Sequence, residues 1–329
     1  MRNGLRNRIF RIKDEKDFLA VALEVFENQH NKNIVYQDFI VSLRKNTETI
    51  KDLEDIPFLP VEFFRNRKIV TGNLPVEMIF ESSGTTGVSP GRHFVNDLSL
   101  YEESFLKTFS LFYGDPSGYL IAALLPSYTE REASSLVYMA DRLIKKSMHP
   151  LSGFYKGNTG DLMQAIKKSK EEKHKTLLLG VSFALLDLAE YEAPDLTGGV
   201  VMETGGMKGR RKEITRQELH KILKEKFKVP SIHSEYGMTE LMSQAYSKGD
   251  GIFYCPPWMK VVIRDPQDPL SVYTESGRTG GINIIDLANI NSCAFIATGD
   301  LGKLHDDDGF EVLGRFDNSD IRGCNLMAE

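Results

Sequence analysis

The stretch Glu81-Ser82-Ser83-Gly84-Thr85-Thr86-Gly87 places four hydroxyl side chains and two glycines directly after the apolar run 75–80. The run is typical of a β-strand. Glycines let backbone N–H groups approach a phosphate closely, and Ser and Thr hydroxyls add further donors. The stretch therefore predicts a phosphate-binding loop after a strand, with a surface turn as the alternative. A Walker P-loop is excluded, because Val88 and Ser89 follow Gly87 where Lys and Ser or Thr would be required.

The composition is that of an ordinary globular protein. The chain has 329 residues, a formal net charge of −5 and 41% hydrophobic residues, which suits one large or two modest domains. The sequence has no sustained run of basic residues, so we expect no nucleic-acid partner. Cys255, Cys293 and Cys324 form no C-x-x-C pair, so we expect free thiols and a cytoplasmic location. We expect no membrane span, since the apolar run 120–125 is too short.

Strands and helices alternate through the middle of the chain. Helical periodicity is seen in the segments 14–50, 97–112, 133–146, 161–173, 182–191 and 211–227. Strands are expected at 119–125, 175–180, 199–203 and 231–235. This order predicts an α/β fold with a mostly parallel sheet covered by helices.

The pattern changes near residue 250. Short strands separated by Gly, Asp and Pro turns are expected at 259–264, 281–287, 294–298 and 310–313, which predicts a smaller antiparallel β-subdomain. The expected division is a helical segment at 1–70, an α/β core at 71–250, the β-subdomain at 251–317 and a tail at 318–329.

Two further motifs follow the first loop in order. One is Glu235-Tyr236-Gly237-Met238-Thr239-Glu240, and the other is Thr298-Gly299-Asp300-Leu301-Gly302 with Gly314-Arg315-Phe316-Asp317 after it. Taken singly, they are also compatible with a strand-end turn and a hairpin turn. With the loop at 82–87, they make the segment 77–317 resemble the acyl-adenylate-forming superfamily of acyl-CoA ligases and adenylation domains.

The resemblance implies a role for each matching residue, with ATP and Mg²⁺ as cofactors. The loop from Ser82 to Gly87 would hold the β- and γ-phosphates. Thr239 would donate to the α-phosphate, and Glu240 would bind Mg²⁺ through a hard carboxylate oxygen. The adenine would lie against Tyr236, Gly237, Gly205 and Gly206. The ribose would be bound by Asp300 and Arg315.

Two departures from the superfamily pattern narrow the resemblance. Many members end the first loop in Pro-Lys, whereas here Arg92 supplies the nearest positive charge. Typical members also continue past the Gly-Arg-x-Asp motif into a mobile domain, while this sequence ends twelve residues after Asp317. A cysteine near that end, Cys324, makes the chain similar to the acyl-protein synthetase family of fatty-acid–luciferin-component ligases. Phenylacetate-CoA ligases are more distant in resemblance.

That family implies activation of a fatty acid, its transfer to Cys324, and its delivery to a partner acyl reductase. A thiolate is a strong nucleophile toward an acyl-phosphate anhydride. Two alternatives stay open: a ligase that uses CoA or a carrier thiol, and a non-catalytic nucleotide-binding scaffold. Among other residues, Cys255 and Cys293 are expected to be packing residues, and Ser182 is expected to be a helix N-cap. His233 is compatible with either an acyl site or a core.

Overall fold

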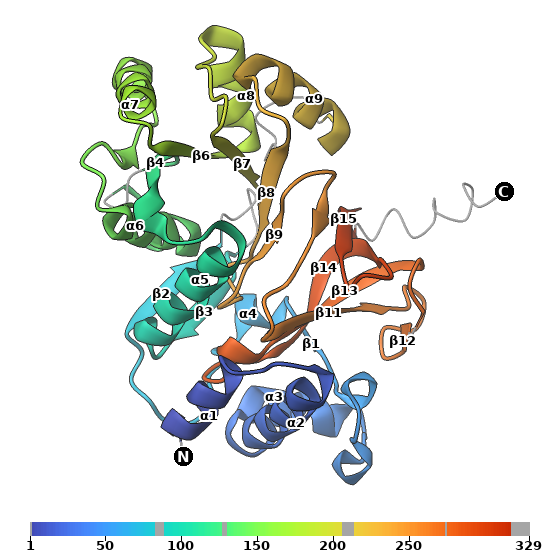
Figure 1. Ribbon diagram of the computed structural model, residues 1–329. Coiled ribbons are helices and arrows are strands. Elements are labelled where there is room, and N and C mark those ends of the chain that lie inside the picture. Colours follow the sequence, from blue (N-terminus) through green and yellow to red (C-terminus); the bar gives the residue numbers. More distant parts are fainter. Residues whose placement is uncertain (1, 83–88, 127–129, 206–213, 274, 317–329) are drawn as a thin grey trace, which may run out of the picture. The chain divides into compact units, whose positions relative to one another are not determined.

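The computed structural model describes residues 2–82, 89–126, 130–205, 214–273 and 275–316 (Figure 1). The chain folds into two compact units. Unit 1 comprises residues 1–104, 239–243 and 254–329, and unit 2 comprises 105–238 and 244–253. The fold is mixed α/β, which confirms the expected fold class.

The helices of unit 1 come first in the chain. They are α1 (Arg2–Ile9), α2 (Glu15–Lys32), α3 (Ile34–Ser42) and the short α4 (Phe63–Asn66). Asp14 caps α2 by accepting a hydrogen bond from the Asp17 amide at 2.8 Å. Asn33 ends α2 and caps α3, because its side chain accepts from the Tyr36 amide at 3.1 Å. Such Asp and Asn caps satisfy amides that a helix start leaves unpaired.

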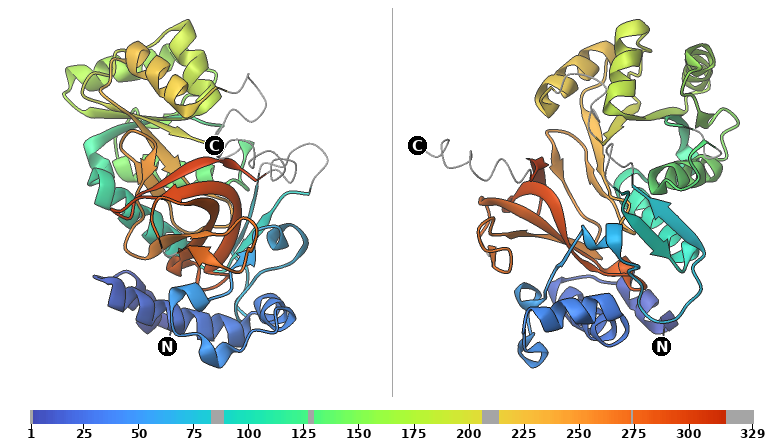
Figure 2. Two further views of the ribbon diagram at one scale, coloured as in Figure 1. Left: turned by 90° about the vertical axis from the view of Figure 1, so that its right-hand side faces the viewer. Right: turned by 180° about the vertical axis from the view of Figure 1, so that it is seen from behind.

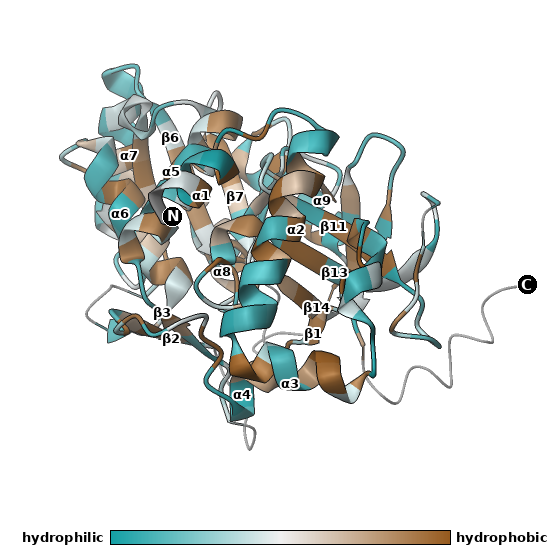
Figure 3. Cartoon of the chain, turned by 90° about the horizontal axis from the view of Figure 1, so that it is seen from below, coloured by the Kyte–Doolittle hydropathy of each residue, from teal (hydrophilic) through white to brown (hydrophobic). Residues whose placement is uncertain are grey.

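Unit 1 also contains an antiparallel sheet. Its strands run in the order β15-β14-β13-β11-β12. They are β11 (Met259–Arg264), β12 (Val272–Tyr273), β13 (Thr279–Asp286), β14 (Phe295–Leu304) and β15 (Phe310–Arg315). Figure 2 shows this sheet from two further sides, and Figure 3 shows how apolar β13 and β14 are. The antiparallel prediction is confirmed for these strands.

Two features of unit 1 were not expected from the sequence. β1 (Leu59–Pro60) pairs in parallel with β14, bringing residues more than two hundred positions apart into register. The motif from Thr298 to Gly302 lies inside β14, with a register shift at Leu301 and Gly302. The hairpin-turn alternative for this motif is therefore wrong.

Unit 2 is built on a six-stranded sheet in the order β5-β4-β6-β7-β8-β9. All neighbours pair in parallel except β8 and β9, which are antiparallel. The strands are β4 (Tyr119–Leu124), β5 (Gly153–Phe154), β6 (Lys175–Val181), β7 (Val200–Thr204), β8 (Ile232–Tyr236) and β9 (Ala245–Ser247). The short β10 (Ile252–Phe253) follows them.

Helices cover this sheet on both faces. α7 (Thr159–Glu171), α8 (Ser182–Tyr191) and α9 (Arg216–Phe227) share one apolar core with it, and α6 (Ser135–Ser147) lies on the opposite face (Figure 1). α9 begins later than expected, because Thr215 and Glu218 form a capping box that fixes its start. α5 (Leu98–Tyr113) passes from unit 1 to unit 2 after Ser104.

Candidate active site

The base of the predicted phosphate loop lies in unit 1, on a two-stranded ribbon of β2 (Met78–Glu81) and β3 (Arg92–Val95). The Ser82 amide donates to the Gly91 carbonyl at 2.9 Å, and the Gly91 amide donates to Ser82 Oγ at 2.8 Å. These two bonds close the ribbon at its loop end. The remaining predicted loop residues, Ser83, Gly84, Thr85, Thr86 and Gly87, lie outside the described residues.

Glu240, the predicted metal ligand, has a buried carboxylate beside this base. Only 7% of the residue is exposed, and a Cβ built on Gly91 would lie 2.4 Å from Glu240 Oε1 and 3.3 Å from Ser82 Oγ. Burial raises the pKa of Glu240, while Arg65 and Arg315 oppose that rise. A buried carboxylate next to a backbone without a side chain fits a hard divalent cation, which would offset the cost of burying the charge.

A buried polar network holds the backbone of Thr239 and Glu240. His93 Nδ1 lies 2.9 Å from the Thr239 carbonyl oxygen, and His93 Nε2 lies 3.1 Å from Asn289 Oδ1. Asn289 Nδ2 donates to the Glu240 carbonyl at 2.8 Å. His93 and Asn289 are not among the site residues predicted from the sequence. Strand alternation could have found His93, because it lies on the face of β3 opposite to Arg92.

The next part of the same segment is held by Asp286. This buried carboxylate accepts hydrogen bonds from the Met242 amide at 2.7 Å and the Ser243 amide at 2.9 Å, and from Ser243 Oγ at 2.6 Å. Burial raises the pKa of Asp286 to about 6, although these donors favour the ionised form. Residues 239–243 are thus held at one end by His93 of β3 and Asn289, and at the other end by Asp286 of β13.

The predicted ribose ligands, Asp300 and Arg315, face each other on neighbouring strands of unit 1. Their Cα atoms are partners in the β14–β15 ladder, and Arg315 Nε lies 3.5 Å from Asp300 Oδ1. The Arg315 side chain is 73% exposed, whereas that of Asp300 is only 14% exposed. An exposed guanidinium beside a fixed carboxylate can rearrange to meet a ligand at little cost.

Arg92, the predicted substitute for the loop lysine, is exposed. Its guanidinium lies 5.7 Å from the centre of the Phe94 ring, two residues along the same face of β3. This cation–π contact holds the charge at the surface of the ribbon.

Unit 2 carries the residues predicted to contact adenine. Tyr236 ends β8 and meets Phe253 edge-to-face, with ring centres 5.9 Å apart. A Cβ on Gly237 would lie 2.3 Å from Glu235 Oε1, so any other residue would displace that carboxylate. Gly205 has a φ of +62°, a left-handed conformation that favours glycine. Gly206 lies outside the described residues.

Two buried carboxylates at the ends of β7 and β8, Glu203 and Glu235, were not predicted as functional. Glu203 lies 3.6 Å from Arg216 Nε and 3.7 Å from His220 Nε2. Burial raises the pKa of Glu203, but His220 and Arg216 outweigh burial and hold it below its usual value. Ser182 Oγ lies 3.0 Å from Glu203 Oε2 and 2.6 Å from the Gly205 carbonyl.

Ser182 is therefore not an N-cap. It is the first residue of α8, whose cap position is Val181. His233, also in unit 2, lies with Nδ1 3.1 Å from the Tyr113 hydroxyl. Burial lowers its pKa to about 4, with a smaller contribution from Lys248, so the ring is neutral at physiological pH.

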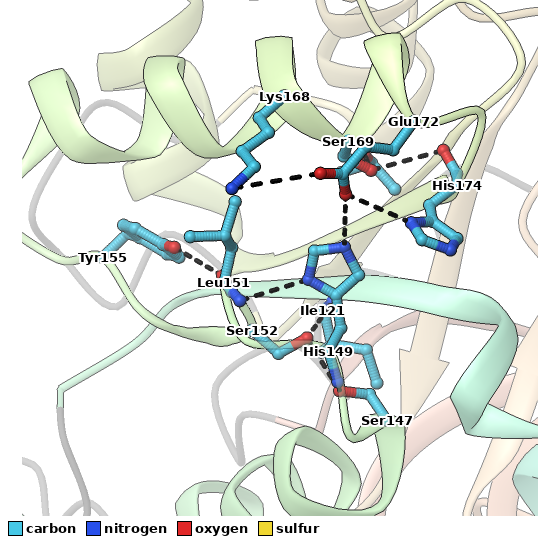
Figure 4. A network of polar contacts seen from close by, with 11 residues as sticks. Ile121, Ser147, His149, Leu151, Ser152, Tyr155, Lys168, Ser169, Glu172 and His174 are labelled. Carbon is cyan, nitrogen blue, oxygen red and sulfur yellow. Dashed lines mark hydrogen bonds and ion pairs between the residues drawn. The ribbon is translucent and has the colours of Figure 1, made fainter.

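A surface group in unit 2 has the composition of a metal site. Glu172 Oε2 lies 4.0 Å from His149 Nε2 and 3.7 Å from His174 Nδ1 (Figure 4). However, the Leu151 amide donates to His149 Nδ1 at 3.2 Å. The neutral ring must then carry its hydrogen on Nε2, where a metal would need a lone pair. We assign no metal to this group.

The two described cysteines do not fit a nucleophile. Cys293 is fully buried, and burial raises the pKa of its thiol to about 12. Burial also raises the pKa of the Cys255 thiol well above its ordinary value. A thiol of this kind holds almost no thiolate at neutral pH. Cys324 lies outside the described residues.

No protein-family model matches the chain. The long-chain-fatty-acid–luciferin-component ligase of Vibrio harveyi is 21% identical over 326 residues, which cover 92% of this chain and 84% of that protein. The resemblance to the acyl-protein synthetases is confirmed. The predicted class, an adenylate-forming ligase, is confirmed with it.

Solved structures show the same fold. ATP-bound MatB from Rhodopseudomonas palustris has a TM-score of 0.54 at 17% identity, over 73% of this chain and 48% of its own. The luciferase-like enzyme of Zophobas morio has a TM-score of 0.52 at 17% identity, over 74% of this chain and 59% of its own. The amide bond synthetase McbA of Marinactinospora thermotolerans also has a TM-score of 0.52 at 17% identity, over 73% and 49%.

The chain thus spans about half the length of these solved structures. Within the residues that the structure describes, no helix is both long and apolar enough to cross a bilayer.

Proposed function

We propose that this chain activates a fatty acid with ATP and then carries the acyl group on its own Cys324. The substrate carboxylate attacks the α-phosphorus of ATP, forming a C–O–P linkage and releasing pyrophosphate. The Cys324 thiolate then attacks the acyl carbonyl, so the acyl–oxygen bond breaks, AMP leaves and a thioester remains. The fatty acid is proposed from the printed name of the Vibrio harveyi relative.

The proposed roles follow the motifs. Ser82 and the loop 83–87 bind the β- and γ-phosphates, with Arg92 adding positive charge. Thr239 donates to the α-phosphate, where negative charge grows during attack. Adenine contacts are assigned to Tyr236, Gly237, Gly205 and Gly206, and ribose contacts to Asp300 and Arg315. Glu240 would hold Mg²⁺, which when bound neutralises phosphate charge.

One observation carries the proposal: the buried Glu240 carboxylate lies against Gly91 and Ser82, at the base of the glycine- and hydroxyl-rich loop. Burying this carboxylate without a partner cation is unfavourable, as the raised pKa of Glu240 indicates. A Mg²⁺ ion bound together with a phosphate at the loop would supply positive charge beside this carboxylate. The similarity to ATP-bound MatB supports the use of ATP.

The acyl transfer to Cys324, a partner acyl reductase and a cytoplasmic location are further parts of the proposal. A thiol tethered to the same chain has a local concentration of roughly millimolar at the site, so the acyl group needs no acceptor that diffuses in from solution. An acyl thioester is also the activated form that a reductase could reduce to an aldehyde.

The test combines pyrophosphate exchange with mass spectrometry of the intact chain. With ATP, Mg²⁺ and fatty acids of graded length, we expect acid-dependent exchange and one covalently bound acyl group. Cys324→Ser should keep the exchange and lose the thioester, while the matched thiol variant Cys255→Ala should retain both. Acyl label that persists in Cys324→Ser would contradict the cysteine role. Acyl-CoA formation by Cys324→Ala would favour an external thiol, and the absence of exchange with every acid would favour a scaffold.

A further inference from the structure

His93 and Asn289 form a two-residue bridge inside unit 1. His93 lies on β3, directly after the ribbon end closed by Ser82 and Gly91. Asn289 lies in the turn between β13 and β14. Each is only 1% exposed. The cavity beside them is about 10 Å³, too small for anything larger than one water molecule.

The bridge acts on the backbone of the second motif. His93 Nδ1 lies 2.9 Å from the Thr239 carbonyl, and since a carbonyl oxygen only accepts, Nδ1 must carry the hydrogen. Asn289 Nδ2 donates to the Glu240 carbonyl at 2.8 Å. Two consecutive carbonyls are thus held by two side chains from different parts of the sequence.

We propose that His93 and Asn289 are positioning residues that hold Thr239 and Glu240 in the geometry required for adenylation. The proposal rests on the proposed function, because it assigns the hydroxyl of Thr239 to the α-phosphate and the carboxylate of Glu240 to Mg²⁺. Because each bridge residue is only 1% exposed, we do not assign either one a contact with the substrate. Their effect is exerted through the backbone from which both functional side chains project.

The orientation of the Asn289 amide is decisive. In a neutral His93 ring, Nε2 has a lone pair and faces Asn289 Oδ1 at 3.1 Å, which is not a favourable contact. Rotating the amide would give His93 a donor, but it would place Oδ1 against the Glu240 carbonyl. The bond to Glu240 is therefore made at the expense of the bond to His93. A residue that can only accept, such as Asp, should fail at this position.

The test compares variants of the bridge with a buried asparagine elsewhere in unit 1. Asn289→Ala and Asn289→Asp remove the donor to Glu240. His93→Leu removes the donor to Thr239, and His93→Asn keeps an N–H in its place. The matched control is Asn33→Ala, since Asn33 is also 1% exposed and donates to the Ser292 carbonyl at 2.9 Å. All variants are made in the full chain.

Two readouts separate positioning from general stability. In pyrophosphate exchange, we expect Asn289→Ala and Asn289→Asp to raise the Mg²⁺ concentration for half-maximal rate about tenfold, the scale seen when groups that orient a metal ligand are removed. We expect His93→Leu to lower kcat and His93→Asn to recover most of it. Hydrogen exchange of peptides covering 239–243 should accelerate in Asn289→Ala and not in Asn33→Ala.

The two readouts also separate failure of this proposal from failure of the proposed function. Equal hydrogen exchange at 239–243 in Asn289→Ala and the wild type would overturn the positioning role, as would an unchanged Mg²⁺ requirement. If the wild type shows no pyrophosphate exchange with any acid, adenylation is wrong. The hydrogen-exchange comparison then still decides whether His93 and Asn289 hold the segment.

Discussion

The two units differ in charge, in sheet type and in how their polar residues are held. Unit 1 contains 20 Lys and Arg against 29 Asp and Glu, a formal charge of −9, whereas unit 2 contains 21 against 17, a charge of +4. In unit 1, contacts distant in sequence hold the segment 239–243. In unit 2, Glu203 and Glu235 are bound by hydroxyls at the ends of the same sheet. The motif Glu235–Glu240 begins in unit 2 and passes into unit 1 after Met238.

One short motif is therefore shared between the two units. Tyr236 and Gly237 belong to unit 2, at the end of β8, whereas Thr239 and Glu240 belong to unit 1 and lie in a turn. Sequence order alone therefore does not say which fold supports a given motif residue. We expect the ionic contacts with the nucleotide to come from unit 1 and the apolar ones from unit 2.

The largest expected effect comes from Glu240→Gln in unit 1. The substitution removes the proposed metal ligand, so we expect pyrophosphate exchange to fall by at least about a hundredfold. Because burial raises the pKa of Glu240, the ionised group costs stability at neutral pH, and the melting temperature should stay equal or rise. Thermal unfolding and exchange kinetics measure both effects. The exposed Glu62→Gln is the control, and exchange within a few-fold of wild type in Glu240→Gln would remove the metal assignment.

Tyr236→Ala tests the apolar contribution of unit 2. Stacking of a base on an aromatic ring is worth about 1–3 kcal/mol, so the KM for ATP should rise about tenfold or more. Tyr236→Phe keeps the ring and should leave the KM almost unchanged, although it loses the hydroxyl contact to Met238. Steady-state exchange at varied ATP distinguishes the two. An equal KM in the alanine and phenylalanine variants would mean that the ring does not contact the nucleotide.

The sequence predicted unit 2 better than unit 1 for a physical reason. The alternating strands and helices of unit 2 each have a local hydrophobic periodicity. The predicted bounds of β4, β6, β7 and β8 therefore agree with the structure to within one or two residues. The pairing of β1 with β14 depends on residues that carry no local signal of each other. Likewise, Glu240 and Asp300 were predicted from motifs, whereas Asn289 lies in an ordinary turn and is recognisable only from its contact.

Glu203→Gln tests the ionic contacts at the sheet end of unit 2. Its lowered pKa means that the ionised carboxylate stabilises the fold above its unfolded pKa of about 4.3, and that this stability is lost as the pH falls below that value. We expect the variant to be less stable by about 1–3 kcal/mol at pH 7, with the difference narrowing below about pH 4.

Urea unfolding, followed by circular dichroism at pH 7 and at pH 3, measures the difference in stability between Glu203→Gln and the wild type. Glu225→Gln is the control, because Glu225 is an exposed carboxylate on α9, the helix that carries the Glu203 partners Arg216 and His220. Because Trp258 is the single tryptophan and lies in unit 1, its fluorescence reports that unit separately. A constant difference between Glu203→Gln and wild type from pH 7 to pH 3 would show that the ionised carboxylate contributes nothing.

The smallest expected effects come from one substitution made in each unit. Gly91→Ala in unit 1 places a Cβ 2.4 Å from Glu240 Oε1, so the carboxylate must move and the Mg²⁺ requirement should rise. Gly160→Ala in unit 2 meets nothing within 4 Å and lies in the first turn of α7, so it should stabilise the chain by up to about 1 kcal/mol. We therefore expect Gly91→Ala to change the Mg²⁺ requirement of pyrophosphate exchange and Gly160→Ala to change the melting temperature. Faster unfolding in both variants, with equal Mg²⁺ requirements, would mean that Gly91 matters for packing alone.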